Sequence, residues 1–232
     1  MQEKAWEAEY QSKRMLLPSN VPQADVVRFA KWLKKQKRQE DSDFDFAKLT
    51  VLDLGSGTGR NAFYFAERGA MAIGYEVSDT ALSFARSYAE EAGLIIDYRK
   101  QDIGSAYPLL DASVDIILDI TSSNSLTDAA RHRYLSEMHR VLKAGGVVFV
   151  RALSKDADKH VKELILRFPG LEEDTYVHPD LHITEKVFTR ESFKETYEPY
   201  FDILNLERVE HYATVSGRKY KRQYWLAYLK NR

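Results

Sequence analysis

From residue 49 onward, short apolar runs alternate with stretches whose apolar residues recur at helical spacing. The runs are typical of buried strands and the spaced stretches of helices with one buried face. Ser78 and Thr127 are residue types that begin helices, and Gly69 and Gly93 are suited to end them. This alternation predicts an α/β fold, a parallel sheet with helices on both faces. The strands are predicted at about 49–54, 71–76, 95–99, 114–120 and 147–152, and the helices at about 59–68, 78–93 and 127–143.

The C-terminal part has a different pattern. Helices are predicted at about 155–168 and 190–198, separated by a stretch without clear periodicity at 169–188. Two strands follow, near 201–209 and 221–229. The first alternates in part, as a half-exposed edge strand does, whereas the second is apolar from Tyr224 to Leu229, as a strand buried on both faces is.

A glycine motif, Asp53-Leu54-Gly55-Ser56-Gly57-Thr58-Gly59, follows the first strand. Glycine allows a sharp turn and lets a ligand touch the backbone. In an open parallel sheet, ligands bind at the carboxyl ends of the strands, where this loop would lie. The dinucleotide fingerprint G-x-G-x-x-G has its third glycine one residue later. The carboxylate of Asp53 also suits a cationic amino group better than phosphates, so an NAD-dependent reductase is disfavoured.

This motif resembles motif I of the class I S-adenosylmethionine-dependent methyltransferases. The resemblance covers residues 49–152 well and 189–229 by pattern only. It implies a doubly wound, mostly parallel seven-stranded sheet whose last strand inserts antiparallel beside the edge strand. The C-terminal pair of strands matches that topology. S-adenosyl-L-methionine is the implied cofactor.

The resemblance also implies roles for individual residues. Asp53 would hold the amino group of the methionine part, and Thr58 or Asn61 its carboxylate. Glu76, at the end of the second strand, would accept hydrogen bonds from the ribose hydroxyls, although it could be a solvated strand-end acid. Asp102 and Ile103 would meet the adenine, although Asp102 could simply form a turn. The residues expected to bind the cofactor are Asp53, Gly55, Ser56, Gly57, Thr58, Gly59, Asn61, Glu76, Val77, Asp102, Ile103 and Asp119.

Two of the polar groups near the predicted site have more than one interpretation. Asp119, which ends the fourth strand, could face the methionine end of the cofactor or cap the loop at 121–125. Arg151 follows the fifth strand and could bind a carboxylate or phosphate of the acceptor, or pair with an acid such as Asp119 or Asp156. The residues proposed to bind the acceptor are Tyr10, Arg14, Asn124, Arg151 and His182.

No catalytic residue can be named from the sequence. Methyl transfer is an in-line displacement in which the protein mainly aligns the reactants and excludes water. A general base is needed only if the nucleophile carries a proton. The 119–125 segment lacks the Asn/Asp-Pro-Pro-aromatic motif of many enzymes that methylate exocyclic or amide nitrogens, which argues against a nucleobase enzyme.

The chain is most simply one domain. Residues 1–48 include a predicted helix at about 22–38 and an acidic loop at 39–48, and we expect them to form an N-terminal cap or lid. Residues 1–20 are polar, with scattered aromatic side chains and no long periodic face. Residues 49–232 would form the methyltransferase-like domain, with 169–188 as an insertion that covers the substrate.

The composition of the chain limits the kinds of partner that it is expected to bind. The net charge of −1 gives no global case for nucleic acid or an anionic membrane, and the basic runs at 31–38 and 218–222 are more typical of solvated faces. The chain has no cysteine, no apparent secretory signal and no apolar run long enough to span a bilayer, so we expect a cytoplasmic location. His178-x-Asp180-x-His182 has metal-ligand spacing too short to be good evidence for a metal site. A loop that covers the substrate or is merely solvated is favoured, and we expect no metal.

The function predicted from these features is methyl transfer to a small polar acceptor. The prediction includes acceptors that carry a negative charge. A small-molecule partner is therefore expected, and the pattern indicates no oligomeric state. The alternatives are an RNA or protein methyltransferase that uses the basic runs, and a non-catalytic module that binds S-adenosylmethionine.

Overall fold

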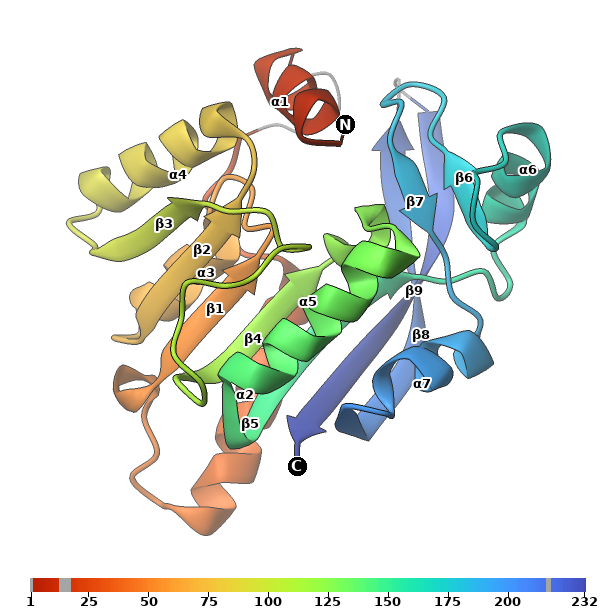
Figure 1. The fold of residues 1–232 in the computed structure, drawn as a ribbon. Helices are drawn as coiled ribbons and strands as arrows, with labels where there is room; N and C mark the ends of the chain where they lie inside the picture. The colour runs from red at the N-terminus through yellow and green to blue at the C-terminus, as the bar shows by residue number, and fades with distance from the viewer. Residues whose placement is uncertain (1, 13–17, 216–217) are drawn as a thin grey trace.

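A computed structural model of the 232-residue chain describes residues 2–12, 18–215 and 218–232 (Figure 1). A seven-stranded sheet has the order β3-β2-β1-β4-β5-β9-β8. β9 runs antiparallel to both of its neighbours and the other adjacent pairs are parallel, which confirms the predicted fold class. The strands are β1 (Thr50–Leu54), β2 (Met71–Glu76), β3 (Ile96–Lys100), β4 (Val114–Ile120), β5 (Leu142–Leu153), β8 (Phe201–Val215) and β9 (Arg218–Asn231).

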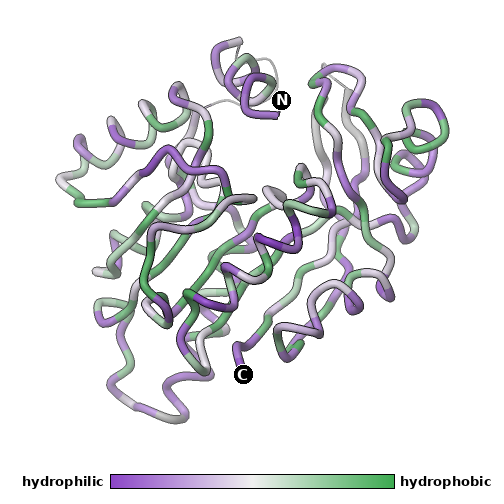
Figure 2. Tube along the Cα trace, in the orientation of Figure 1, coloured by the Kyte–Doolittle hydropathy of each residue, from purple (hydrophilic) through white to green (hydrophobic). Residues whose placement is uncertain are grey.

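Helices cover both faces of this sheet. The helices α5 (Asp128–Val141) and α7 (Arg190–Tyr197) pack on one face, where Leu52, Val148 and Ala227 are buried. α2 (Ala24–Glu40), α3 (Arg60–Ala66) and α4 (Asp79–Glu91) pack on the other. Residues alternate between the two faces because successive side chains of a strand point in opposite directions. Hydrophobic positions accordingly concentrate along the central strands (Figure 2).

Several elements differ from the predicted ones. The segment between the predicted helix at 127–143 and the predicted strand at 147–152 is part of β5, which begins directly after α5, and Leu142 already pairs with Val114. The helix α6 (Lys159–Arg167) is shorter than predicted, and β8 and β9 are longer because they pair with each other almost to the turn between them. Within 169–188 lies a small hairpin of β6 (Thr175–Val177) and β7 (Thr184–Lys186).

The N-terminal segment contains a helix that the apolar pattern does not indicate, α1 (Gln2–Ser12). It lies beyond the carboxyl ends of β1, β2 and β4, across the gap between α4 and the β6–β7 hairpin (Figure 1). None of its residues belongs to the hydrophobic clusters that fix the sheet and its helices. Within the ranges described above, no helix is both long and apolar enough to cross a membrane.

Candidate active site

A cavity of about 530 Å³ lies at the carboxyl ends of β1, β2 and β4, under α1. Its size is that of small-molecule sites. The glycine loop, the end of β2, the loops after β3 and β4, and one side of α1 form its walls. The residues expected to bind the cofactor that line it are Gly55, Ser56, Gly57, Thr58, Asn61, Glu76, Val77, Asp102 and Ile103. Asp53, Gly59 and Asp119 are not among the lining residues.

The glycine loop can hold its shape only with glycine. Gly55, Gly57 and Gly59 have φ of +67°, +56° and +81°, in the left-handed region that strains other residues. A Cβ on Gly55 would overlap the Ser122 side chain, and one on Gly57 would lie 2.5 Å from the Tyr10 hydroxyl oxygen. The loop is therefore closed in by the segment after β4 and by α1.

Glu76 joins this loop to the end of β2. Its Oε1 accepts hydrogen bonds from the backbone N–H groups of Val77 (2.8 Å) and Ser78 (2.9 Å), and its Oε2 accepts one from Gly57 (2.9 Å). Burial raises the pKa of Glu76, against these hydrogen bonds, which lower it. A carboxylate oxygen can accept two hydrogen bonds, so Oε2 keeps capacity for a ligand hydroxyl in the cavity.

Two acids lie beneath the cavity. Asp53 is buried, and its Oδ2 accepts a hydrogen bond from Ala62 N–H at 3.2 Å. Burial is the main cause that raises the pKa of Asp53 to about 7.

Asp119 is also buried, and it accepts hydrogen bonds from the N–H groups of Ser122 (3.0 Å) and Ser123 (3.1 Å) and from the Tyr134 hydroxyl (2.6 Å). These bonds use both of its oxygens. Asp119 therefore caps the loop after β4, which is the second of its two predicted roles.

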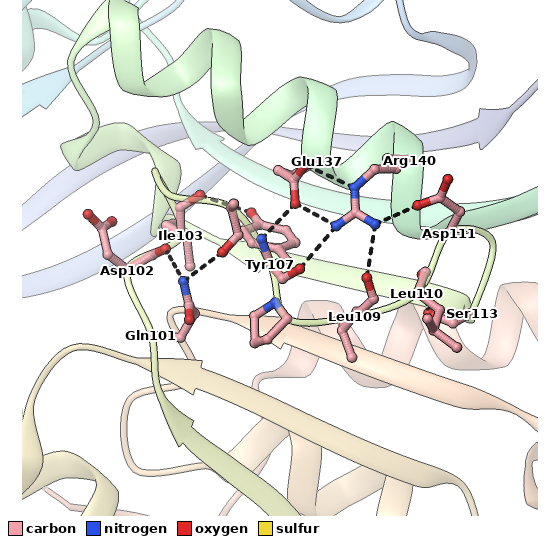
Figure 3. A network of polar contacts seen from close by, with 12 residues as sticks. Gln101, Asp102, Ile103, Tyr107, Leu109, Leu110, Asp111, Ser113, Glu137 and Arg140 are labelled. Carbon is pink, nitrogen blue, oxygen red and sulfur yellow. Dashed lines mark hydrogen bonds and ion pairs between the residues drawn. The ribbon is translucent and has the colours of Figure 1, made fainter.

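Polar side chains of α5 hold the loop after β3 through a network of hydrogen bonds (Figure 3). Arg140 donates to the carbonyl oxygens of Tyr107 (3.0 Å) and Leu109 (2.9 Å), and Glu137 accepts from Tyr107 N–H (2.6 Å). The Tyr107 hydroxyl in turn donates to Ile103 O at 2.9 Å. These contacts fix the Ile103 backbone where it lines the cavity.

Asp102 both forms a turn in this loop and lines the cavity. Its Oδ1 accepts a hydrogen bond from Gly104 N–H at 2.8 Å, which is the turn-forming arrangement expected as the alternative. It also lines the cavity, and its side chain is exposed. The turn and the contact with a ligand are thus compatible.

Polar contacts dock α1 at its start and near its middle. Near its middle, Glu7 accepts hydrogen bonds from the hydroxyls of Ser78 and Thr80, each at 2.6 Å, at the start of α4. At its start, Gln2 Nε2 donates to Ser125 O (2.6 Å) and Thr184 O (3.2 Å), which joins the helix to the loop after β4 and to β7. Gln2, Glu3, Trp6 and Tyr10 line the cavity.

Three of the residues expected to bind the acceptor lie elsewhere. The buried Asn124 donates to Lys186 O at 2.5 Å, and His182 is exposed in a turn with φ of +54°. Arg151 lies 3.8 Å from Asp25 and stacks over the Tyr224 ring, 4.0 Å from its centroid. Its acidic partner is thus neither Asp119 nor Asp156. Tyr10 does line the cavity, and Arg14 lies outside the described residues.

His178, the other histidine of the weak metal-ligand pattern, closes a turn. Its Nδ1 accepts hydrogen bonds from the N–H groups of Asp180 and Leu181, both at 3.3 Å. In the part of the chain that the structure describes, no group of three or more histidine or acidic side chains could hold a metal ion.

Residues 51–146, which contain the glycine loop and the strands around it, match the family model described as a methyltransferase domain. The matched part of the chain is a methyltransferase domain, and its seven-stranded sheet has the class I methyltransferase fold. A solved S-adenosylmethionine-dependent methyltransferase from Methanosarcina mazei has the same fold, with a TM-score of 0.69 and 20% identity over 79% of this chain and 92% of that one.

Curated relatives of this methyltransferase act on small molecules, according to their names. The ubiquinone biosynthesis O-methyltransferase of Pseudomonas paraeruginosa is 24% identical over 164 residues, covering 63% of this chain and 70% of that protein. The 2-heptyl-1-hydroxyquinolin-4(1H)-one methyltransferase of Mycobacteroides abscessus is 33% identical over 108 residues, covering 46% of this chain and 47% of that protein. The match to the second thus spans about half of its length.

S-adenosylmethionine is the cofactor of this methyltransferase, and the cavity fits it. The backbone of the glycine loop lines the cavity at Gly55 and Gly57, where a ligand can contact it. Glu76 offers an acceptor for hydroxyls, and Asp53 lies beneath the loop as an acid suited to an amino group. One lining residue that the sequence analysis missed is Arg60, although it directly follows the glycine motif.

Proposed function

We propose that this methyltransferase transfers the methyl group of S-adenosylmethionine to a small polar acceptor. The observation that carries the proposal is a cavity of about 530 Å³ that α1 covers and that must serve both cofactor and acceptor. A macromolecular acceptor would have to displace α1 from its contacts with Ser78, Thr80, Ser125 and Thr184. A small acceptor can be enclosed beneath it.

The cofactor would lie along the carboxyl edge of the sheet. The glycine loop and Asn61 would contact its methionine part, with Asp53 acting on the amino group from beneath. Glu76 would accept from the ribose hydroxyls through its remaining lone pair on Oε2. Val77 and Ile103 would contact the adenine, and Asp102 would accept from its amino group.

The bound cofactor supplies an electrophilic methyl group on a sulfonium, so this chain has to orient the reactants and keep water out. Thr121 and Ser122 line the cavity directly after β4, and Thr121 has φ of +65°, a conformation that is costly for this residue type. Asp119 holds these residues in place by accepting from Ser122 N–H and Ser123 N–H. Trp6 and Tyr10 of α1 exclude water from the opposite side.

The names of the relatives favour an oxygen nucleophile on a small molecule over RNA or protein. The expectation of an anionic acceptor rested on Arg151. Because that guanidinium pairs with Asp25 and stacks on Tyr224, polarity rather than charge is the property that we propose for the acceptor. The cap formed by 1–48 and the cover formed by 169–188 would meet through Gln2 and Thr184.

The test is transfer of a labelled methyl group from S-adenosylmethionine to an extract separated into small-molecule, RNA and protein fractions. We expect the label in the small-molecule fraction. Label in the RNA or protein fraction would support the macromolecular alternative instead. If S-adenosylhomocysteine binds but no fraction is labelled, the chain is a cofactor-binding module without turnover.

A further inference from the structure

Arg60 is a cation in the cavity wall with no hydrogen bond or ion pair to the described residues. It is the first residue of α3, it is partly buried, and it lines the cavity. Within the described residues it makes no hydrogen bond or ion pair, although Asp53 and Tyr10 are its electrostatic neighbours. Burial lowers the pKa of Arg60. A guanidinium held in that position without an anion is suited to bind one from a ligand.

The two residues expected to hold the cofactor carboxylate already make other contacts, and of their side-chain donors only the Asn61 amide N–H has no contact with a described residue. The Thr58 hydroxyl donates its hydrogen to Ser19 O at 2.9 Å. Asn61 Oδ1 accepts from Gln23 N–H at 3.2 Å. Both side chains tie the segment before α2 to the glycine loop. The Asn61 amide N–H that remains is an uncharged donor, and Arg60 is the only lysine or arginine that lines the cavity among the residues described. Arg60 is therefore the charged donor available to the carboxylate of a bound cofactor.

Tyr10 reaches the same place from α1. Its hydroxyl lies over Gly57, where a Cβ would come within 2.5 Å of the oxygen. Burial, together with the charge of Glu76, raises the pKa of Tyr10, so the hydroxyl keeps its hydrogen and can donate it. It forms no hydrogen bond with any residue in 2–12, 18–215 or 218–232. Tyr10 and Arg60 are thus two donors without acceptors, one on α1 and one on α3.

We propose that Arg60 and Tyr10 together bind the carboxylate of the methionine part of S-adenosylmethionine, and that this shared contact holds α1 closed. The inference rests on the proposed function, since it concerns the same cofactor. An arginine can donate a hydrogen bond to each of the two carboxylate oxygens. Such charge-assisted hydrogen bonds are among the strongest in proteins. Because the two donors belong to different elements, a ligand that joins them also joins α1 to α3.

The test compares two ligands that differ in the amino-acid part. S-adenosylhomocysteine carries the carboxylate, and 5′-methylthioadenosine lacks it. Arg60→Gln should weaken S-adenosylhomocysteine roughly ten- to hundredfold and leave 5′-methylthioadenosine unchanged, as measured by calorimetry. Tyr10→Phe should weaken S-adenosylhomocysteine several-fold. Arg28→Gln, which removes an exposed arginine on α2 paired with Glu207, is the matched control and should change neither affinity.

Hydrogen exchange of the α1 amides tests the closure. S-adenosylhomocysteine should slow exchange in α1 of the wild type, whereas 5′-methylthioadenosine should not, and Arg60→Gln should abolish the difference at saturating ligand. Equal weakening of both ligands by Arg60→Gln, or none, would overturn the carboxylate site. An affinity loss without any change in α1 exchange would overturn the closure. A wild type that binds neither ligand would overturn the proposed function itself.

Discussion

Asp53 is an acid kept out of water directly beneath the cofactor loop. Burial raises its pKa to about 7, against the lowering effects of the Ala62 N–H and Arg60. An ammonium group placed beside it would favour the carboxylate and lower that pKa. Binding of S-adenosylhomocysteine should therefore release a proton just below pH 7, and affinity should rise with pH up to about 7 and then level off.

Calorimetry in two buffers of different ionisation enthalpy measures this proton. The observed binding enthalpies should differ between the buffers for the wild type and agree for Asp53→Asn. 5′-methylthioadenosine, which lacks the amino-acid part and its ammonium group, serves as the ligand control. Equal enthalpies in both buffers for the wild type would show that Asp53 does not sense the ligand.

Glu76 holds the backbone of the glycine loop and is also expected to bind the cofactor. A single substitution would remove both roles. It accepts backbone hydrogen bonds from Gly57, Val77 and Ser78. Glu76→Ala should cost about 1.5–3 kcal/mol of cofactor affinity and also lower the melting temperature without ligand, because buried N–H groups lose their acceptor. Calorimetry and thermal unfolding measure the two effects. Glu90→Ala, at an exposed acid of α4, should change neither, and unchanged affinity in Glu76→Ala would remove Glu76 from the site.

At the scale of elements, the sequence predicted the features that neighbouring residues determine, such as the helix caps. Ser78 and Thr127 cap α4 and α5 by accepting from Ala81 N–H (3.1 Å) and Ala130 N–H (3.2 Å), as the sequence indicates. α1 could not be found in this way, because polar contacts such as that of Glu7 hold it rather than an apolar face. The hairpin in 169–188 was missed because strands of three residues leave no periodicity.

The docking of α1 through Glu7 should depend on pH. Burial alone would raise the pKa of Glu7, but the hydrogen bonds from Ser78, Thr80 and Gln11 outweigh it and hold it at about 2. A lowered pKa contributes stability above the ordinary value of 4.5, and that contribution is lost as the pH falls from 4.5 toward 2. Glu7→Gln should speed amide exchange in α1 at neutral pH, and the difference from the wild type should shrink below pH 4.5.

Glu191→Gln, at an exposed position in the first turn of α7, is the control for this experiment. It should leave exchange in α1 unchanged at every pH. A difference between wild type and Glu7→Gln that persists undiminished at the lowest pH reached by the folded protein would contradict the assignment to this carboxylate.

Removal of α1 should separate function from folding. None of its side chains enters the hydrophobic clusters, so a chain that begins at residue 19 should keep a cooperative unfolding transition close to that of the full chain. Its turnover and its affinity for S-adenosylhomocysteine should fall, since Trp6 and Tyr10 are lost from the cavity. Full activity of the shortened chain would make α1 a surface appendage.

At the scale of the whole molecule, the sequence predicted the sheet and the cofactor loop better than the acceptor site. Gly55, Gly57 and Glu76 reach the cavity because strand ends and a local turn place them there. The direction of Arg151 depends instead on partners from distant segments, Asp25 of α2 and Tyr224 of β9, which no local pattern identifies. Arg60 was missed for the same reason. Its proposed role as a carboxylate-binding residue depends on Tyr10, which the fold places over the glycine loop.

The charge distribution of the assembled cavity predicts which adenosine ligands stabilise the molecule. Among its described lining residues, Arg60 is the only arginine or lysine, against the acids Glu3, Glu76 and Asp102. That balance suits a ligand with an amino group and one carboxylate, and it disfavours the two phosphates of NAD. S-adenosylhomocysteine at a hundred times its Kd should stabilise the fold by about 2.7 kcal/mol, which raises the melting temperature by roughly 5–10 °C in a domain of this size. NAD at the same concentration should give no shift. Thermal unfolding with each ligand measures the difference, and an equal shift with NAD would contradict the charge argument, because no second cation of the described wall could then account for the phosphates.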